Sequence, residues 1–195
     1  MITQYSKALA DKLISVSNTH VNSEDLEVYI YGIECIVNTG VTTLLLLLWG
    51  FITSSILETV AWLLCFLLLR HYTGGIHAPT QISCMICSTL LGMLNLPIIT
   101  LVNFSFMQVT TIYIISIIIG IVFAPAKTKK REFSISERKK HKLLTLIIII
   151  VCFFFTIVFP KSIGHAISYA IFVDIMLLLT KVIVDYVVNN LIIKN

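Results

Sequence analysis

The segment from Arg70 to Cys84 holds residue types that can do chemistry, whereas the stretches on either side are apolar. It runs Arg-His-Tyr-Thr-Gly-Gly-Ile-His-Ala-Pro-Thr-Gln-Ile-Ser-Cys. A thiolate is a strong nucleophile, and an imidazole can give a proton to a leaving amine. His77, with Cys84 seven residues after it, therefore forms a candidate catalytic pair for a thiol peptidase.

The residues before and between this pair predict how they come together. Gly74-Gly75 breaks a helix and permits positive φ. Pro79 disfavours the α conformation at Ala78 and suits the first turn of a helix that follows. We therefore expect His77 in a loop and Cys84 in the first turn or two of the next helix. In one straight helix the pair would be about 10 Å apart along the axis, so the break is what lets His77 fold back toward Cys84.

The composition of the chain predicts that apolar helices flank this segment. The chain has 195 residues, of which 57% are hydrophobic and 12% charged, and its mean hydropathy is +0.96. No charged residue occurs in the 56 positions between Arg70 and Lys127. Charged residues make up about a quarter of an ordinary soluble domain. The composition therefore excludes a disordered chain, a disulfide-stapled secreted module and most soluble enzymes, and it predicts one all-α polytopic membrane domain over residues 1–195.

About 20 apolar residues are needed to cross the hydrocarbon core as a helix. Six stretches are predicted to do so: Ile36–Thr53, Ile56–Leu69, about Cys84–Val102, about Met107–Phe123, Leu143–Phe159 and Gly164–Val184. Before them, residues 1–30 lack the apolar core of a secretory signal. Apolar residues recur there at spacings of three or four from Ile2 to Val16. This is typical of an amphipathic helix, either on the membrane surface or packed as a soluble lead-in.

The basic segment 127–142 predicts the orientation in the membrane. Eight Lys or Arg residues there oppose two Glu, and loops with such an excess of positive charge stay in the cytoplasm. Counting spans from it puts residues 70–83 and both termini on the cytoplasmic side. The net charge of +4 comes from this segment, because the rest of the chain is net negative. The expected partners of this one basic segment are anionic lipid headgroups or an acidic peptide, and not nucleic acid. Glu34, at the cytoplasmic start of the first span, becomes the candidate third group that orients His77, whereas Glu58 lies on the far side.

Two alternatives use the same segment. His71, His77, Cys84 and Cys87 supply enough ligands for tetrahedral zinc, and Cys84-Met85-Ile86-Cys87 has the spacing of a redox pair. Replacing Cys87 by Ser separates these alternatives from a peptidase with one thiol, which would not need Cys87.

An ionisable residue also lies near the middle of the sixth span. A carboxylate is costly there, which makes Asp174 conspicuous. Lys181 follows seven residues later on the same helical face, and we expect it to offset this charge as a structural pair. The isolated cysteines Cys35, Cys65 and Cys152 are expected to be small hydrophobic residues of the spans.

Two separated motifs resemble one family. They are the run Arg70–Pro79 with Cys84 beyond it, and Ala124-Pro125-Ala126-Lys127-Thr128-Lys129-Lys130 after the fourth span. Together with the size and span pattern they resemble the accessory gene regulator B (AgrB) family, membrane cysteine endopeptidases of Gram-positive quorum sensing. The resemblance implies that the chain cuts the C-terminal tail from a precursor peptide of the AgrD type. The cysteine would form an acyl-enzyme thioester, which a thiol of the peptide then attacks to give a cyclic thiolactone.

The resemblance also assigns residues and partners. The catalytic pair of the family falls on His77 and Cys84, and its sensitive arginine and glycine fall on Arg70 and Gly75. Its basic stretch implicated in peptide processing falls on Lys129, Lys130 and Arg131. It implies no cofactor, requires neither His71 nor Cys87, and suggests a homodimer. A small transporter or exporter and a non-enzymatic membrane adaptor remain as alternatives.

Overall fold

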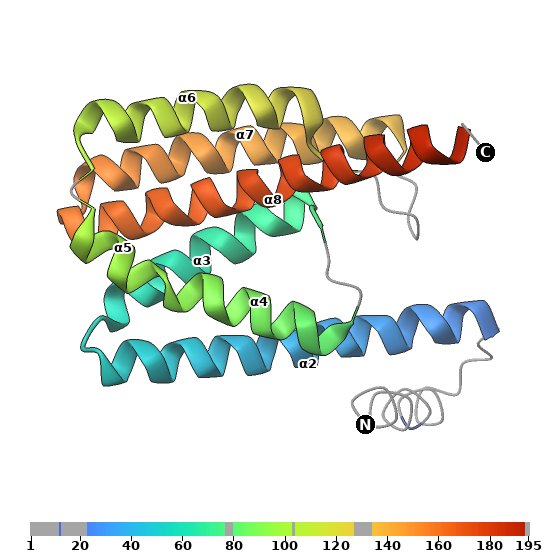
Figure 1. Cartoon of the computed structure of the whole chain (residues 1–195), viewed down its shortest axis with the longest axis horizontal. Coiled ribbons are helices and arrows are strands. Elements are labelled where there is room, and N and C mark those ends of the chain that lie inside the picture. Colours follow the sequence, from blue (N-terminus) through green and yellow to red (C-terminus); the bar gives the residue numbers. More distant parts are fainter. Residues whose placement is uncertain (1–11, 13–22, 77–79, 103, 127–133, 194–195) are drawn as a thin grey trace. The chain divides into compact units, whose positions relative to one another are not determined.

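The computed structural model describes residues 12, 23–76, 80–102, 104–126 and 134–193. Every regular element in these residues is an α-helix, and no strand occurs among them, as the composition predicted. Figure 1 shows the helices: α2 (Ser23–Ile52), α3 (Ile56–Thr73), α4 (Gln81–Met93), α5 (Asn95–Leu101), α6 (Phe106–Phe123), α7 (Ile135–Val158) and α8 (Lys161–Ile193). The amphipathic helix predicted between Ile2 and Val16 lies outside the described residues apart from Lys12.

Six segments of the described chain are long and apolar enough to cross a membrane, which confirms the predicted fold class. They are Gly32–Ile52, Ile56–Thr73, Gln81–Leu101, Phe106–Phe123, Ile135–Val158 and Lys161–Val188. Large apolar side chains remain exposed along them, among them Leu44, Ile118 and Ile150. Such continuous apolar surface is typical of helices that face lipid. The molecule is therefore a multi-pass membrane protein.

Two of these helices begin earlier than predicted. Helix α2 begins at Ser23 instead of Ile36, because polar residues extend the helix beyond the apolar stretch. Helix α7 begins at Ile135, so part of the predicted basic loop 127–142 is helical. Ser134 and Glu137 form a reciprocal capping box that starts α7. This arrangement satisfies backbone N–H groups that the first turn of a helix leaves unpaired.

The third predicted stretch consists of two helices. Helix α4 ends at Met93 and α5 begins at Asn95, with Leu94 between them. Pro97 lies in the first turn of α5, where a residue without an N–H does not cost a helical hydrogen bond. Together α4 and α5 make the third candidate span, Gln81–Leu101, close to the predicted stretch Cys84–Val102.

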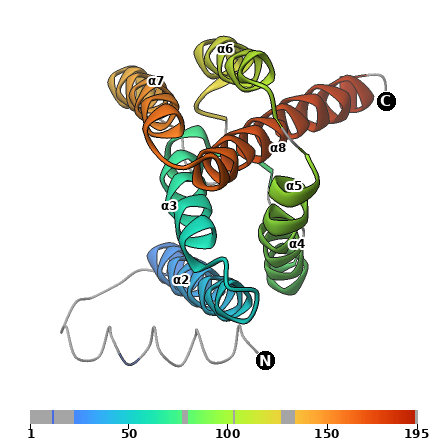
Figure 2. The same cartoon turned by 90° about the vertical axis from the view of Figure 1, so that its left-hand side faces the viewer.

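The chain divides into two compact units. The first comprises residues 1–45 and 78–89, and the second comprises residues 46–77 and 90–195. In the first unit, α2 and the beginning of α4 are joined by a hydrogen bond from Gln81 to Glu34. In the second unit, α3, α6 and α7 each pack against α8, as Figure 2 shows.

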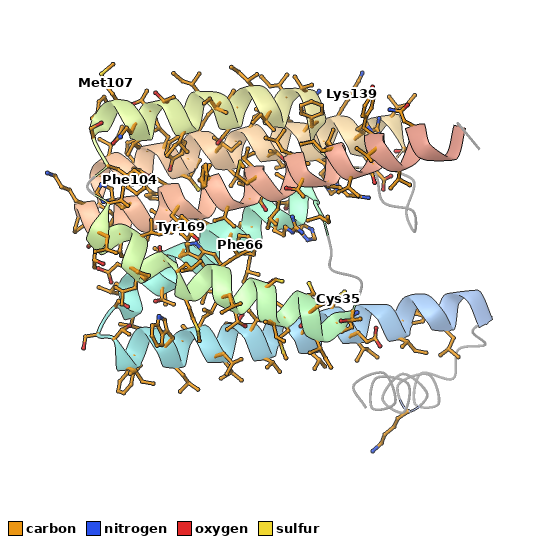
Figure 3. All side chains as sticks on the ribbon, in the orientation of Figure 1. Cys35, Phe66, Phe104, Met107, Lys139 and Tyr169 are labelled. Carbon is orange, nitrogen blue, oxygen red and sulfur yellow. The ribbon has the colours of Figure 1, made fainter. Side chains whose placement is uncertain are left out.

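Helix α8 forms the core of the second unit. Ala166 and Ala170 are fully buried on it, and small side chains allow transmembrane helices to approach closely. At Gly164 an added Cβ would lie 2.7 Å from the carbonyl oxygen of Thr156 on α7, so the approach of these two helices requires glycine. Facing α3, Tyr169 belongs to the same buried cluster as Phe66, and both are labelled in Figure 3.

The end of α3, the end of α6 and the start of α7 gather at one end of the second unit (Figure 1). The backbone N–H of Ala126, just after α6, donates to the carbonyl of Thr73 at 2.9 Å. The rings of His71 and His141 lie 6.5 Å apart between centroids. The end of α3 and the first turns of α7 are therefore at the same end of the second unit, in agreement with the span count.

Candidate functional site

Helix α3 ends at the predicted glycine pair. It continues through Arg70 to Thr73, one turn beyond the predicted end at Leu69. Gly74 then adopts φ 70° and Gly75 adopts φ 136°. Residues with a side chain rarely adopt these angles, so glycine at both positions is what turns the chain away from the helix. The break predicted between His77 and the preceding span is confirmed.

Arg70 closes the turn that follows. Its Nη1 donates to the carbonyl of Gly74 at 2.9 Å, and its Nη2 donates to the carbonyl of Ile76. Gly75 lies directly against this guanidinium, because a Cβ added there would be 1.8 Å from Nη1. The arginine and the glycine that the family resemblance singled out therefore work as one unit that shapes the segment Thr73–Ile76, which we call the hinge loop.

The hinge loop is also bonded to two other elements. The Thr73 hydroxyl donates to Asp174 Oδ2 on α8 at 2.7 Å, and both side chains are fully buried. The N–H of Ile76 donates to the carbonyl of Leu177, three residues further along α8, at 3.4 Å. Together with the bond from Ala126 to Thr73, these contacts hold the hinge loop from two sides.

The expected pairing of Asp174 with Lys181 is wrong. Lys181 Nζ lies 2.6 Å from Oδ1 of Asp185, four residues further along α8. Spacings of four and seven residues both put side chains on one helical face, and the nearer carboxylate is the one that Lys181 contacts. Asp174 instead has Thr73 as its hydrogen-bond donor and lies close enough to Arg70 for a Coulombic attraction. Sequence spacing could not reveal a donor 101 positions away.

Cys84 lies in the first turn of α4, as predicted. Its N–H donates to the carbonyl of Thr80 at 3.0 Å. Thr80 and Ser83 exchange hydrogen bonds between their side chains and backbone N–H groups, at 3.2 and 3.3 Å. This is a capping box with serine in the place usually taken by Glu or Gln. The thiol of Cys84 is half-buried, whereas Cys87, one turn later, is exposed.

Glu34 lies beside the same turn within the first unit. Its side chain is buried, 8% exposed, and Oε2 accepts a hydrogen bond from Gln81 Nε2 at 3.1 Å. Gln81 is three residues before Cys84 and therefore on the same face of α4. Gln81 did not emerge from the sequence as a site residue, because a single glutamine at a helix start carries no distinctive signal.

Of the other predicted site residues, some lie outside the described residues and His71 lies at the end of α3. His77 lies outside the described residues, as do Lys129, Lys130 and Arg131. The basic residues that follow them are in the first turns of α7, where Lys139 is exposed and labelled in Figure 3. His71 is exposed, and its ring contacts those of Tyr72 and His141, with centroids 4.9 and 6.5 Å apart.

No group of three or more potential ligands that could hold a metal ion occurs among the residues that the structure describes. The zinc set proposed from the sequence includes His77, so it stays untested. All five cysteines are within the described ranges, and none of them is in a disulfide. Cys65 and Cys152 nevertheless approach to 3.5 Å between their sulfurs, and thereby join α3 to α7 in the second unit.

The fold and this arrangement define a class: a helical membrane protein with six candidate spans in its described residues, the second of which ends in a glycine turn shortly before Cys84 in the sequence. The family model described as accessory gene regulator B matches residues 6–182. The chain belongs to the accessory gene regulator B family. No solved structure matches it.

Individual relatives agree with this assignment. The chain is 30% identical over 132 residues to the accessory gene regulator protein B of Staphylococcus aureus (strain Newman), covering 67% of this chain and 69% of that protein. It is 29% identical over 167 residues to the putative AgrB-like protein 2 of Clostridium perfringens (strain 13 / Type A), covering 77% and 75%. Family membership supports a part in accessory gene regulator quorum sensing.

Proposed function

We propose that this protein is a membrane cysteine endopeptidase that removes the C-terminal tail of an AgrD-type precursor peptide and promotes its closure to a thiolactone. Cys84 is the nucleophile and His77 is the general acid and base. The observation that carries the proposal is the position of Cys84 in the first turn of a helix. The N-terminal end of a helix favours negative charge, and a thiolate is the species that attacks.

The chemistry proceeds in two transfers. The Cys84 thiolate attacks the scissile carbonyl carbon, and the resulting oxyanion collapses with loss of the tail amine, which takes a proton from His77. This leaves the peptide joined to Cys84 as a thioester. A thiol within the peptide then gives its proton to His77 and attacks the thioester carbonyl. The new carbon–sulfur bond closes the ring, and the Cys84 thiolate leaves.

Supporting residues act on this pair. Glu34 is proposed to orient His77, and its burial next to the turn of Cys84 supports a local role. Lys129, Lys130 and Arg131 are proposed to bind the precursor by charge, since a cationic segment attracts an acidic peptide. The same residues would attract anionic lipids. Assembly as a homodimer is part of the proposal, and the family resemblance is its support.

The active side is proposed to be cytoplasmic. The basic first turns of α7 support this, because positive charge stays on the cytoplasmic side and because α7 begins at the same end of the second unit as α3 ends. Ser136 is exposed in these turns and offers a reporter site. In Ser136→Cys, a membrane-impermeant maleimide should label this position in inverted vesicles and not in intact cells. Labelling in intact cells would show that the orientation is opposite to the one proposed.

The test of the activity is co-expression with an AgrD-type precursor peptide, followed by mass measurement of both fragments. The unchanged chain should release the tail and a cyclic product. Cys84→Ala and His77→Ala should each abolish tail removal. Cys87→Ser should retain it, which would exclude zinc or redox chemistry that uses Cys84 together with Cys87. Tail removal by Cys84→Ala at the normal rate would leave the transporter or adaptor as the function.

A further inference from the structure

Helix α8 has a carboxylate fully buried in its membrane-spanning part. Asp174 is 0% exposed, and the described residues around it on α8 include the buried Ile171 and Leu178. A carboxylate in such surroundings is costly unless it is paired and hydrogen-bonded. Replacement of buried polar pairs by apolar residues is often neutral or stabilising. Stability alone therefore gives little reason for an acid at this position.

The hydrogen bond to Asp174 comes from the hinge loop. The Thr73 hydroxyl has one proton and three acceptors within reach: Asp174 Oδ2 at 2.7 Å, the carbonyl of Leu69 at 3.0 Å and that of Gly74 at 3.1 Å. The bond to Asp174 is the shortest of the three. The carboxylate therefore selects the rotamer of Thr73 and fixes the end of α3 against α8.

The same carboxylate faces the guanidinium that shapes the loop. Arg70 attracts Asp174 electrostatically and donates to the carbonyls of Gly74 and Ile76. One helical turn beyond Asp174, Leu177 accepts from the N–H of Ile76. Two positions on one face of α8 thus hold the first and last residues of the hinge loop, and His77 is the next residue in the chain.

We propose that Asp174 is a positioning residue for the peptidase reaction: through Thr73 and Arg70 it fixes the hinge loop from which the chain continues to His77. This inference rests on the proposed function, because it assigns Asp174 to the placement of the histidine that acts on Cys84. Displacement of a reacting group by about 1 Å can cost on the order of 100-fold in rate. Asp174 touches no reacting atom and acts only through the loop.

The test uses the full-length chain in detergent with iodoacetamide as the probe. Alkylation of Cys84 is followed by peptide mass spectrometry, and Cys87, three residues later and exposed, serves as the reference thiol within the same peptide. His77→Ala sets the ratio of Cys84 to Cys87 labelling that corresponds to loss of the imidazole. Thr73→Val and Asp174→Asn should lower this ratio by about tenfold or more toward that value, with a matching loss of tail removal per folded molecule.

Matched variants distinguish positioning from a general effect on folding. Thr73→Ser keeps the hydroxyl and should restore the ratio. The double variant of Thr73→Val with Asp174→Asn should be no worse than the more impaired of the two single variants, because both substitutions act on the same contact. Asp185→Asn makes the same carboxylate-to-amide change on α8, at a residue whose contact is Lys181, and should leave the ratio unchanged.

The outcomes separate this inference from the function on which it rests. If Thr73→Val and Asp174→Asn change only the thermal midpoint and leave the labelling ratio and tail removal per folded molecule intact, the positioning role is wrong and the peptidase stands. If Cys84→Ala still removes the tail, the peptidase itself is wrong. Should Asp174→Asn fail to accumulate, Thr73→Val decides, since it removes one hydroxyl and keeps the shape of the side chain.

Discussion

The hinge loop and the turn of Cys84 are held in different ways. The loop is fixed by residues from distant parts of the chain, with Thr73 bonded to Asp174, 101 positions away, and to Ala126 after α6. The turn of Cys84 is fixed by its own neighbours, since Thr80 and Ser83 bond to each other across three positions. A side-chain bond from Gln81 to Glu34 also joins this turn to α2.

This difference shows which half of the candidate site depends on the tertiary fold. A capping box forms wherever its local sequence forms a helix start. A threonine bonded to a buried carboxylate requires two helices to be packed correctly. We therefore expect variants of the hinge loop to be more damaging than variants of the α4 turn, and four substitutions test this order.

The largest effect is expected for Gly75→Ala. The added methyl group would overlap the Arg70 guanidinium, and φ 136° is strained for any residue with a side chain. Backbone strain of this kind costs about 1–3 kcal/mol, and displacement of Arg70 adds to it. Tail removal should fall below detection, and the thermal midpoint of the purified protein should fall. Gly40→Ala, where an added Cβ meets nothing within 4 Å, is the control and should keep both.

Arg70→Lys should come next. A lysine keeps the charge but lacks the planar fork with which arginine binds two carbonyls at once. The loss of one charged hydrogen bond costs about 1.5–3 kcal/mol when the acceptor is buried, and less here because Arg70 is half-buried. Tail removal should drop by about tenfold or more while the protein still accumulates. Full activity in Arg70→Lys would show that charge alone shapes the loop.

A smaller effect is expected for Gln81→Leu. The substitution removes the amide that donates to Glu34, and leaving a buried acceptor without this donor costs about 1 kcal/mol or more. Hydrogen exchange of the α4 backbone should accelerate in its first turns and remain unchanged in α8. Faster exchange in α8 as well would mean that the two units do not respond separately.

The smallest effect is expected for Thr80→Ala, which removes one half of the capping box. Loss of an N-cap costs about 0.5–2 kcal/mol, and the exposure of these bonds puts this one at the low end. Tail removal should change by less than about tenfold. The control is Thr110→Ala, whose exposed hydroxyl bonds within its own helix. A defect in Thr80→Ala as severe as that of Gly75→Ala would reverse the order proposed for the two regions.

Much of the fold could be predicted because a membrane imposes simple requirements on sequence. The length and hydropathy of each span, and the helix break at Gly74-Gly75, follow from local residue types. The start of α7 was readable in principle, since Ser134 and Glu137 have capping-box spacing. The prediction missed it because it followed hydropathy, which changes only at Leu143.

The contacts that shape the site could not be predicted from the sequence. No local pattern shows that Asp174 accepts from Thr73 or that Gln81 reaches Glu34, because these pairs are far apart in the sequence and meet only after packing. Asp174 was singled out by its cost in a membrane, yet the sequence suggested Lys181 as its partner. Composition identifies an unusual residue more readily than it identifies what that residue contacts.

Helix α8 does not stop where the hinge loop meets it. Beyond Leu177, which accepts from Ile76, the helix continues to Ile193, about 24 Å further at the usual rise per residue. In Figure 1 its red end runs past the end of α3, and Tyr186, Val187 and Val188 are exposed along it. Helix α8 therefore extends well beyond its contact with the hinge loop, and this last part of the helix carries exposed apolar side chains.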